Sequence, residues 1–124
     1  MTGHQIINRA LTLLGYTDTE GNLRVSDRIK KRATELLNEV YSEVFYTVNE
    51  GEFVPLGSLL EAVNLSDSAI WALTAGVAAF MAQAESDLSA AAWWTNIYNS
   101  RRLRLTSVTS KKEVLPDLPR GWKK

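Results

Sequence analysis

The stretch that most constrains the fold is an alanine-rich apolar run at residues 66–84. It opens with Ser66 and Asp67, good N-cap residues because a short side-chain oxygen accepts from the unpaired N–H groups of a first helical turn. The residues between the large ones are small, so neighbouring backbones can approach this helix closely. We therefore predict a central helix that contacts others on several faces. Its large apolar residues follow a helical stripe at Ile70, Trp71, Leu73, Val77, Phe80 and Met81.

A second helix is expected directly after this run. The acidic corner at residues 85–87 offers a fresh N-cap, and apolar residues resume at Leu88. Trp93 and Trp94 are adjacent, and adjacent helical side chains point about 100° apart, so one is expected in the core and the other at an interface. The helix ends in arginines, which complement the helix dipole at a C-terminus. Residues 66–105 are thus predicted to form a long helical hairpin.

Two further helices are predicted in the first half of the chain. Thr2 and Gln5 have the spacing of a capping box, and Gly15 is a natural stop for the short helix that follows. From about Ser26 to Val48, apolar residues recur at intervals of three and four, which indicates a long amphipathic helix. Its outer face is expected to be a solvated stripe, first basic (Lys30, Lys31, Arg32) and then acidic (Glu35, Glu39, Glu43). The fold class is therefore all-α, a small four-helix bundle.

Two segments break the helical pattern. Residues 49–64 contain Gly51, Pro55 and Gly57 and are predicted to form an irregular loop, with a short extended piece at residues 52–56 and one helical turn at residues 59–63. The leucines of this loop favour packing or burial in a partner. Phe53, Val54, Pro55 and Leu56 are its candidate inter-subunit contacts.

Residues 106–124 are predicted to form an extended C-terminal arm after a helical domain at residues 1–105. Pro116 and Pro119 pre-set an extended backbone, which lowers the cost of ordering upon docking. The large apolar residues of the arm, Val114, Leu115, Leu118 and Trp122, suit an arm that lies across another surface. The alternative is a frayed terminus.

Charge is segregated along a chain whose net charge is zero. Residues 1–32 hold six Lys or Arg and three Asp or Glu. Residues 33–100 hold no Lys or Arg and nine Asp or Glu, and residues 101–124 hold eight Lys or Arg and two Asp or Glu. An acidic body with a basic tail can pair within one molecule, or with the next copy in a head-to-tail ring.

Several function classes find no support in the sequence. There is no cysteine for a disulfide or a thiolate metal site, and the single histidine, His4, has no companion ligands. The apolar run at residues 70–84 is shorter than the roughly 20 residues that a membrane span needs, and no secretion signal is recognisable. With no catalytic arrangement among the Ser, His and carboxylate residues, we expect neither enzyme activity nor a cofactor.

The order of these elements resembles the small head–tail connector proteins of tailed bacteriophages, the adaptors that sit beneath the portal. The resemblance covers roughly residues 3–105. It includes Leu14-Gly15 at the end of the first helix and the Leu-Ser-Asp…Gly-Val-Ala-Ala…Ala-Glu-Ser-Asp pattern of residues 65–87. It closes with Trp94 and Tyr98 just before Asn99-Ser100-Arg101-Arg102.

The resemblance implies a structural virion protein of the phage neck. Such proteins form a ring, commonly of twelve copies, that extends the DNA channel and helps retain the packaged genome. The implied partners are other copies, the portal, and tail or stopper proteins, with DNA passing through the channel without sequence-specific binding. No membrane is involved, and the host cytoplasm is the place of assembly.

The expected portal or subunit interface combines the helix-terminal arginines with the arm, because connectors often insert a C-terminal segment into a neighbour. The alternative is a small helical DNA-binding or regulatory protein that uses its basic clusters as phosphate contacts. The expected interface residues are Arg101, Arg102, Arg104, Lys111, Lys112, Val114, Leu115, Leu118, Arg120 and Trp122.

Overall fold

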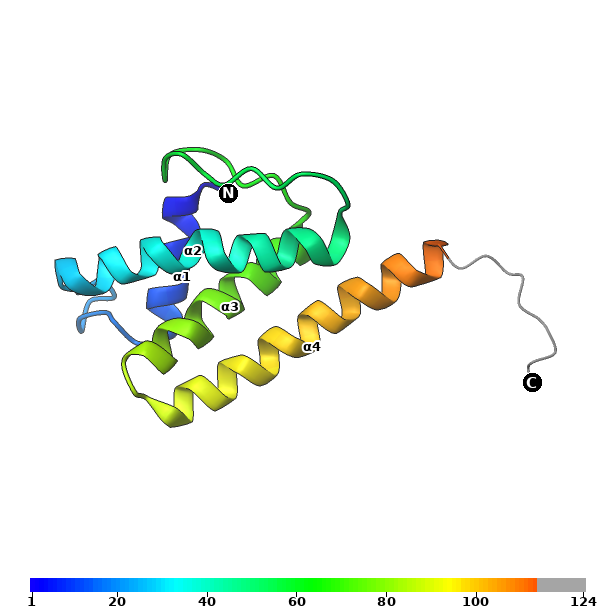
Figure 1. Ribbon diagram of the computed structural model, residues 1–124. Helices are drawn as coiled ribbons and strands as arrows, with labels where there is room; N and C mark the ends of the chain where they lie inside the picture. The colour runs from blue at the N-terminus through cyan, green and yellow to red at the C-terminus, as the bar shows by residue number, and fades with distance from the viewer. Residues whose placement is uncertain (114–124) are drawn as a thin grey trace.

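Four α-helices build the part of the chain that the structure describes. The structure is a computed structural model, and it describes the backbone of residues 1–113 and the side chains of residues 1–106. Over these residues there is no β-strand, so the predicted all-α four-helix bundle is confirmed. The helices are α1 (Gly3–Leu13), α2 (Asp27–Val48), α3 (Asp67–Ala84) and α4 (Leu88–Glu113) (Figure 1).

Each helix begins where a short polar side chain caps it. Thr2 forms the predicted capping box with Gln5, Ser26 accepts from the backbone N–H of the third residue after it, and Ser66 does the same at the start of α3. At α4, the Asp87 carboxylate accepts from the backbone N–H of Ala90 at 3.2 Å. Each such cap stabilises its helix by about 1 kcal/mol. These caps explain why the helix starts were readable from the sequence.

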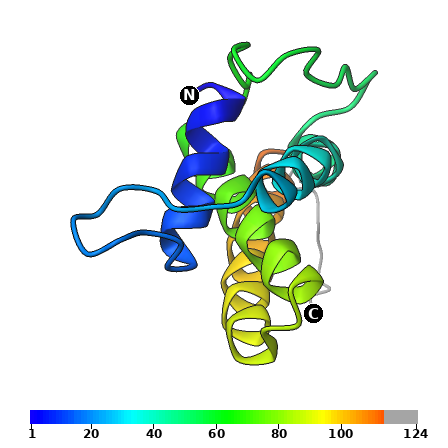
Figure 2. The same cartoon turned by 90° about the vertical axis from the view of Figure 1, so that its left-hand side faces the viewer.

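The centre of the bundle is α3, which packs against all three other helices and most extensively against α4. Figure 2 shows α1 and α2 on either side of α3, with α4 below it. A Cβ built on Gly76 would lie 2.5 Å from Val40 Cγ1 and 2.7 Å from Tyr98 Cε1. Only glycine therefore allows α2 and α4 to approach α3 this closely, as the small-residue pattern predicted.

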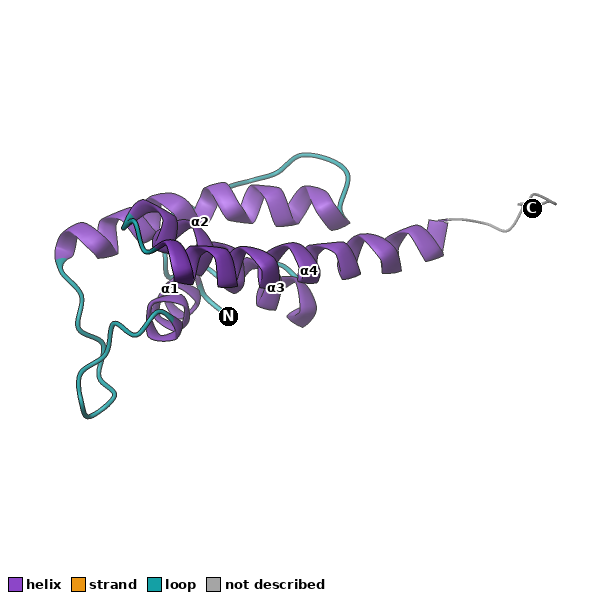
Figure 3. Cartoon of the chain, turned by 90° about the horizontal axis from the view of Figure 1, so that it is seen from below, coloured by secondary structure: helices purple, strands orange, loops and turns teal. Residues whose placement is uncertain are grey.

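α3 and α4 form the predicted hairpin, and α4 runs back past the beginning of α3 and extends well beyond it (Figures 1 and 3). The corner between them contains Ser86 with a φ of 62°, a left-handed conformation that non-glycine residues rarely adopt. Arg28 at the start of α2 donates two hydrogen bonds of 3.0 Å to the Glu85 carboxylate. The corner is thereby tied to the start of α2.

The boundary predicted at Leu105 is wrong, because α4 continues to Glu113. Residues 106–113 are therefore helical, whereas an extended arm was predicted for them. This segment contains no glycine or proline, and extending an existing helix is far easier than starting one. The side chains of Lys111 and Lys112, and the whole of Val114, Leu115, Leu118, Arg120 and Trp122, lie outside the described residues.

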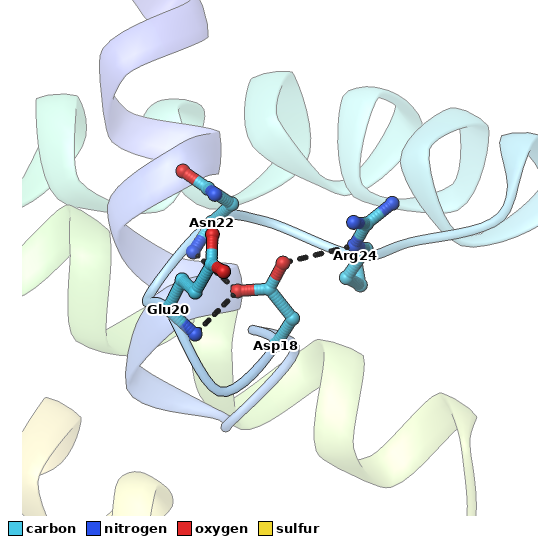
Figure 4. Close-up of polar contacts among 4 residues, drawn as sticks. All are labelled: Asp18, Glu20, Asn22 and Arg24. Carbon is cyan, nitrogen blue, oxygen red and sulfur yellow. Dashed lines mark hydrogen bonds and ion pairs between the residues drawn. The ribbon is translucent and has the colours of Figure 1, made fainter.

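The loop between α1 and α2 is organised by Asp18. Its carboxylate accepts from the backbone N–H groups of Glu20 and Asn22, both at 2.9 Å, and from Arg24 Nε at 3.1 Å (Figure 4). The hydrogen bond from the Asn22 backbone is the main reason that the pKa of Asp18 lies below its usual value. Gly15, with a φ of 89°, turns the chain into this loop after the last turn of α1.

The predicted irregular loop of residues 49–64 is confirmed, and side chains of α2 hold it in place. Asn38 donates to the carbonyl of Leu56 and accepts from its N–H, at 3.2 and 2.9 Å. The Tyr41 hydroxyl accepts from the N–H of Asn64 at 3.3 Å. Residues 52–56 form no strand, and residues 59–63 form only a turn. The loop is thus packed without regular secondary structure.

Candidate interaction surface

The three arginines predicted as one interface cluster face two different sides of α4. Arg102 turns towards α2, and its guanidinium lies 3.7 Å from the carboxylate of Glu43 on that helix. The same guanidinium lies 5.1 Å from the ring centroid of Tyr98, one turn earlier on α4. Arg101 turns the other way, and its Nη1 donates to the carbonyl of Trp71 at 2.9 Å. Arg104 is exposed on the same side as Arg101. Arg102 therefore serves a contact within the molecule, and Arg101 and Arg104 belong to a separate surface.

That surface is organised by Trp71, whose side chain is 48% exposed. Arg9 from α1 and Arg101 from α4 both contact the indole, with their guanidinium carbons 5.2 and 5.4 Å from the ring centroid. The predicted place of Trp71 in the buried stripe of α3 is wrong, because its neighbour Ile70 takes the buried position. Arg9 is not predictable from the sequence, since no local pattern indicates that α1 approaches this tryptophan.

Trp71 lies on the floor of a groove between two helices. Both α1 and α4 pack against α3, but within the described residues they do not pack against each other. Hollows open on both sides of the indole, one towards α1 and the other towards α4. We call this feature the Trp71 groove, and its polar and aromatic lining consists of Arg9, Asp67, Ser68, Trp71, Arg101 and Arg104.

The outer face of α4 continues the groove. Trp93, which is 64% exposed, lies on the same helix face as Ile97, and a further hollow connects both with Arg101 and Arg104. Trp94, in contrast, is half-buried against the core. The prediction that one of the two packs on the core is therefore confirmed, and the placement of Trp93 at an interface stays a prediction.

The composition of this surface suits a protein partner. Trp and Arg are enriched in the cores of protein–protein interfaces and among the residues whose truncation costs most binding energy. A cation stacked on an aromatic ring contributes about 0.5–1 kcal/mol at an exposed site. Stacking on Trp71 also holds the arginines in place before any partner arrives, which lowers the entropy lost on binding.

A second surface of opposite charge lies on the outer side of α2. Glu35, Glu39 and Glu43 are exposed there, and Tyr46, one further turn along, is 54% exposed. We call these four residues the acidic α2 face. The predicted acidic stripe is therefore confirmed as exposed, although Glu43 is more than a solvated charge because it also accepts a hydrogen bond from the Tyr98 hydroxyl. Burial of the Tyr98 ring, followed by this contact, raises the pKa of Tyr98 above its usual value.

The loop residues predicted as inter-subunit contacts divide into two pairs. Phe53 packs edge-to-face on Tyr41, with ring centroids 5.0 Å apart, and Leu56 is half-buried against the core. Val54 is 72% exposed, and Pro55 is exposed as well. Phe53 and Leu56 thus hold the loop to its own bundle, which leaves Val54 and Pro55 as the pair open to a partner.

Two further site classes were considered over the described part of the chain. There, no group of three or more His, Cys, Asp or Glu side chains is placed to hold a metal ion. None of the helices described is both long and apolar enough to cross a lipid bilayer.

Comparison of the chain with protein-family models, with curated proteins and with solved structures found no match in any of the three.

Proposed function

We propose that this chain is a structural subunit of a phage neck, which assembles as a ring between the portal and the tail. In this role it extends the DNA channel and helps to retain packaged DNA. The observation that carries the proposal is the Trp71 groove, an exposed tryptophan held between two arginines on a chain without net charge. Such a surface recognises protein, and the order of the helices supports a connector, because it follows the order that the sequence resemblance implied.

The alternative, a small DNA-binding or regulatory protein, fits the surface less well. Duplex DNA is held mainly by several simultaneous phosphate contacts from Lys and Arg. Of the three α4 arginines, Arg102 is turned towards Glu43, and Arg101 donates to a backbone carbonyl. Asp67 also lines the groove and would repel phosphate. A DNA channel favours this weak engagement, because DNA must slide through it.

Co-expression with the portal protein encoded in the same genome tests this proposal. We expect a complex whose mass exceeds that of the portal by a whole number of 13.8 kDa subunits. A truncation after Glu113 keeps the whole of α4 and removes the apolar residues of the C-terminal arm, Val114, Leu115, Leu118 and Trp122. If this arm docks on the portal, the truncation should weaken the complex. Failure to associate, combined with salt-sensitive binding of the purified chain to DNA, would refute the neck role and favour the regulator.

A further inference from the structure

We propose that copies of this chain meet head to tail, with the Trp71 groove of one copy receiving the acidic α2 face of the next. The partner for the groove is thus a second copy of the same chain. This inference deepens the proposed function and rests on its self-assembly, because it names the two surfaces that would join neighbouring subunits.

Charge complementarity is the first argument. The groove presents Arg9, Arg101 and Arg104, whereas the α2 face presents the exposed carboxylates of Glu35 and Glu39. Glu43 on the same face is engaged by Tyr98 and Arg102 of its own molecule. Arginine binds carboxylates with two parallel hydrogen bonds, so such pairs give orientation as well as attraction. Asp67 is an acidic residue at the groove's edge, and the cations outnumber it.

Position in the fold is the second argument. α2 buries Leu37, Val40 and Val44 in the core, and Glu35 and Glu39 lie exposed on the side of α2 that faces away from it. The groove opens between α1 and α4, and Figure 2 shows α1 and α2 on either side of α3. Within one molecule α4 reaches this face at Glu43, through Tyr98 and Arg102. Glu35 and Glu39, two turns and one turn earlier on α2, are therefore the carboxylates that we assign to the next copy, and the groove and this face are separate patches. Because they are different patches, their contact is heterologous, and repetition of such a contact closes a ring or builds a filament.

Matching dimensions and apolar content are the third argument. On α4, the stripe from Trp93 to Arg104 covers eleven helical steps, and on α2 the stripe from Glu35 to Tyr46 covers the same number. Each stripe is about 16 Å long at 1.5 Å per residue. Half-exposed aromatic residues lie on both sides, Trp71 and Trp93 on one and Tyr46 on the other. These are the residue types that anchor protein interfaces.

A charge-swap experiment tests the pairing directly. The variant Arg9→Glu/Arg104→Glu makes the groove acidic, and Glu35→Arg/Glu39→Arg makes the α2 face basic; all four positions are exposed, so both variants should fold. Each variant alone sets like charges against each other and should lose all species above the monomer mass. An equimolar mixture should restore them, because each variant's groove then opposes the other variant's α2 face with opposite charge. Lys30→Glu/Lys31→Glu is the control: it makes the same change of charge as the groove variant, on the first turns of α2 next to the acidic α2 face but outside it.

Cysteine trapping then identifies the contacting residues. The chain has no cysteine, so single variants Arg104→Cys and Glu39→Cys give unambiguous cross-links. We expect a disulfide-linked dimer when the two variants are mixed and not when either is oxidised alone. Equal cross-linking of either variant with itself would overturn the inference but leave self-assembly intact. Normal assembly of the charge variants on the portal would also overturn the inference and leave self-assembly intact. If the groove variant alone lost DNA binding, the groove would be assigned to nucleic acid instead.

Discussion

At the scale of single residues, the close approach of α2 and α4 to α3 depends on the absence of a side chain at Gly76. Three helices meet at this position, where Val40 of α2 and Tyr98 of α4 occupy the space that a Cβ would need. Both neighbours are buried, at 0% and 2% exposure, so neither can simply swing into solvent. A methyl group at this position would therefore displace α2 or α4.

The substitution Gly76→Ala should lower the free energy of unfolding, because overpacking a core costs about 1–3 kcal/mol. Alanine gains about 1 kcal/mol over glycine in a helix, so the expected net loss is up to about 2 kcal/mol. Urea denaturation followed by circular dichroism measures the change. Gly57→Ala is the matched control, because a Cβ there meets only the end of the Glu61 side chain. Unchanged stability of Gly76→Ala would contradict the packing described here.

At the scale of helices and loops, the corner between α3 and α4 is held from outside by the start of α2. The two hydrogen bonds from Arg28 are the main reason that the pKa of Glu85 lies below its usual value. A carboxylate with a lowered pKa in the folded state stabilises the protein above its unfolded pKa. This contribution is lost as the pH falls through the folded pKa.

Glu85→Gln should therefore reduce stability at pH 7 and make the acid-induced loss of stability shallower below about pH 4.5. Urea midpoints measured between pH 7 and pH 3 test this prediction. In an Arg28→Ala background the same substitution should change little, because the partner is already missing. A large effect of Glu85→Gln in that background would show that the carboxylate acts through other groups.

Helix starts were predictable at this scale, and one helix end was not. The N-cap residues Thr2, Ser26 and Ser66 indicate the starts of α1, α2 and α3 in the sequence, because capping is a local interaction. The end of α4 had no such local signal. The arginines near residue 105 were read as a terminus, whereas two of them make contacts with Trp71 and Glu43 in the middle of the helix.

At the scale of the whole molecule, the surfaces depend on how the helices are arranged, and this limits what the sequence could reveal. The sequence indicated that Arg101 and Arg104 belong to an interface, and the structure places both beside Trp71. The sequence did not indicate Arg9 as part of this surface. Arg9 lies 62 positions before Trp71 and reaches the indole only because α1 packs across α3. A half-exposed tryptophan in an otherwise buried helix likewise follows from the gap between α1 and α4.

If opposite charges join neighbouring copies, self-association should weaken as salt is added. Raising the ionic strength from about 0.1 M to about 1 M shortens the Debye length from about 10 Å to about 3 Å. With two or three exposed ion pairs of up to 1 kcal/mol each, the dissociation constant should rise about tenfold. Analytical ultracentrifugation at several salt concentrations measures it. Association that strengthens with salt would point to a contact dominated by apolar burial.

The overhang of α4 has a mechanical consequence. With 26 residues against the 18 of α3, α4 is about 39 Å long and α3 about 27 Å, so α4 behaves as a stiff rod clamped along part of its length. A tilt of about 5° at the hairpin corner would move the far tip by about 3 Å at this rod length. The close contact of Tyr98 with Gly76 belongs to the part of α4 that is held against α3. A small change of angle at the corner would therefore become a displacement of several ångströms at the overhanging end, about 3 Å for the tilt of about 5° above.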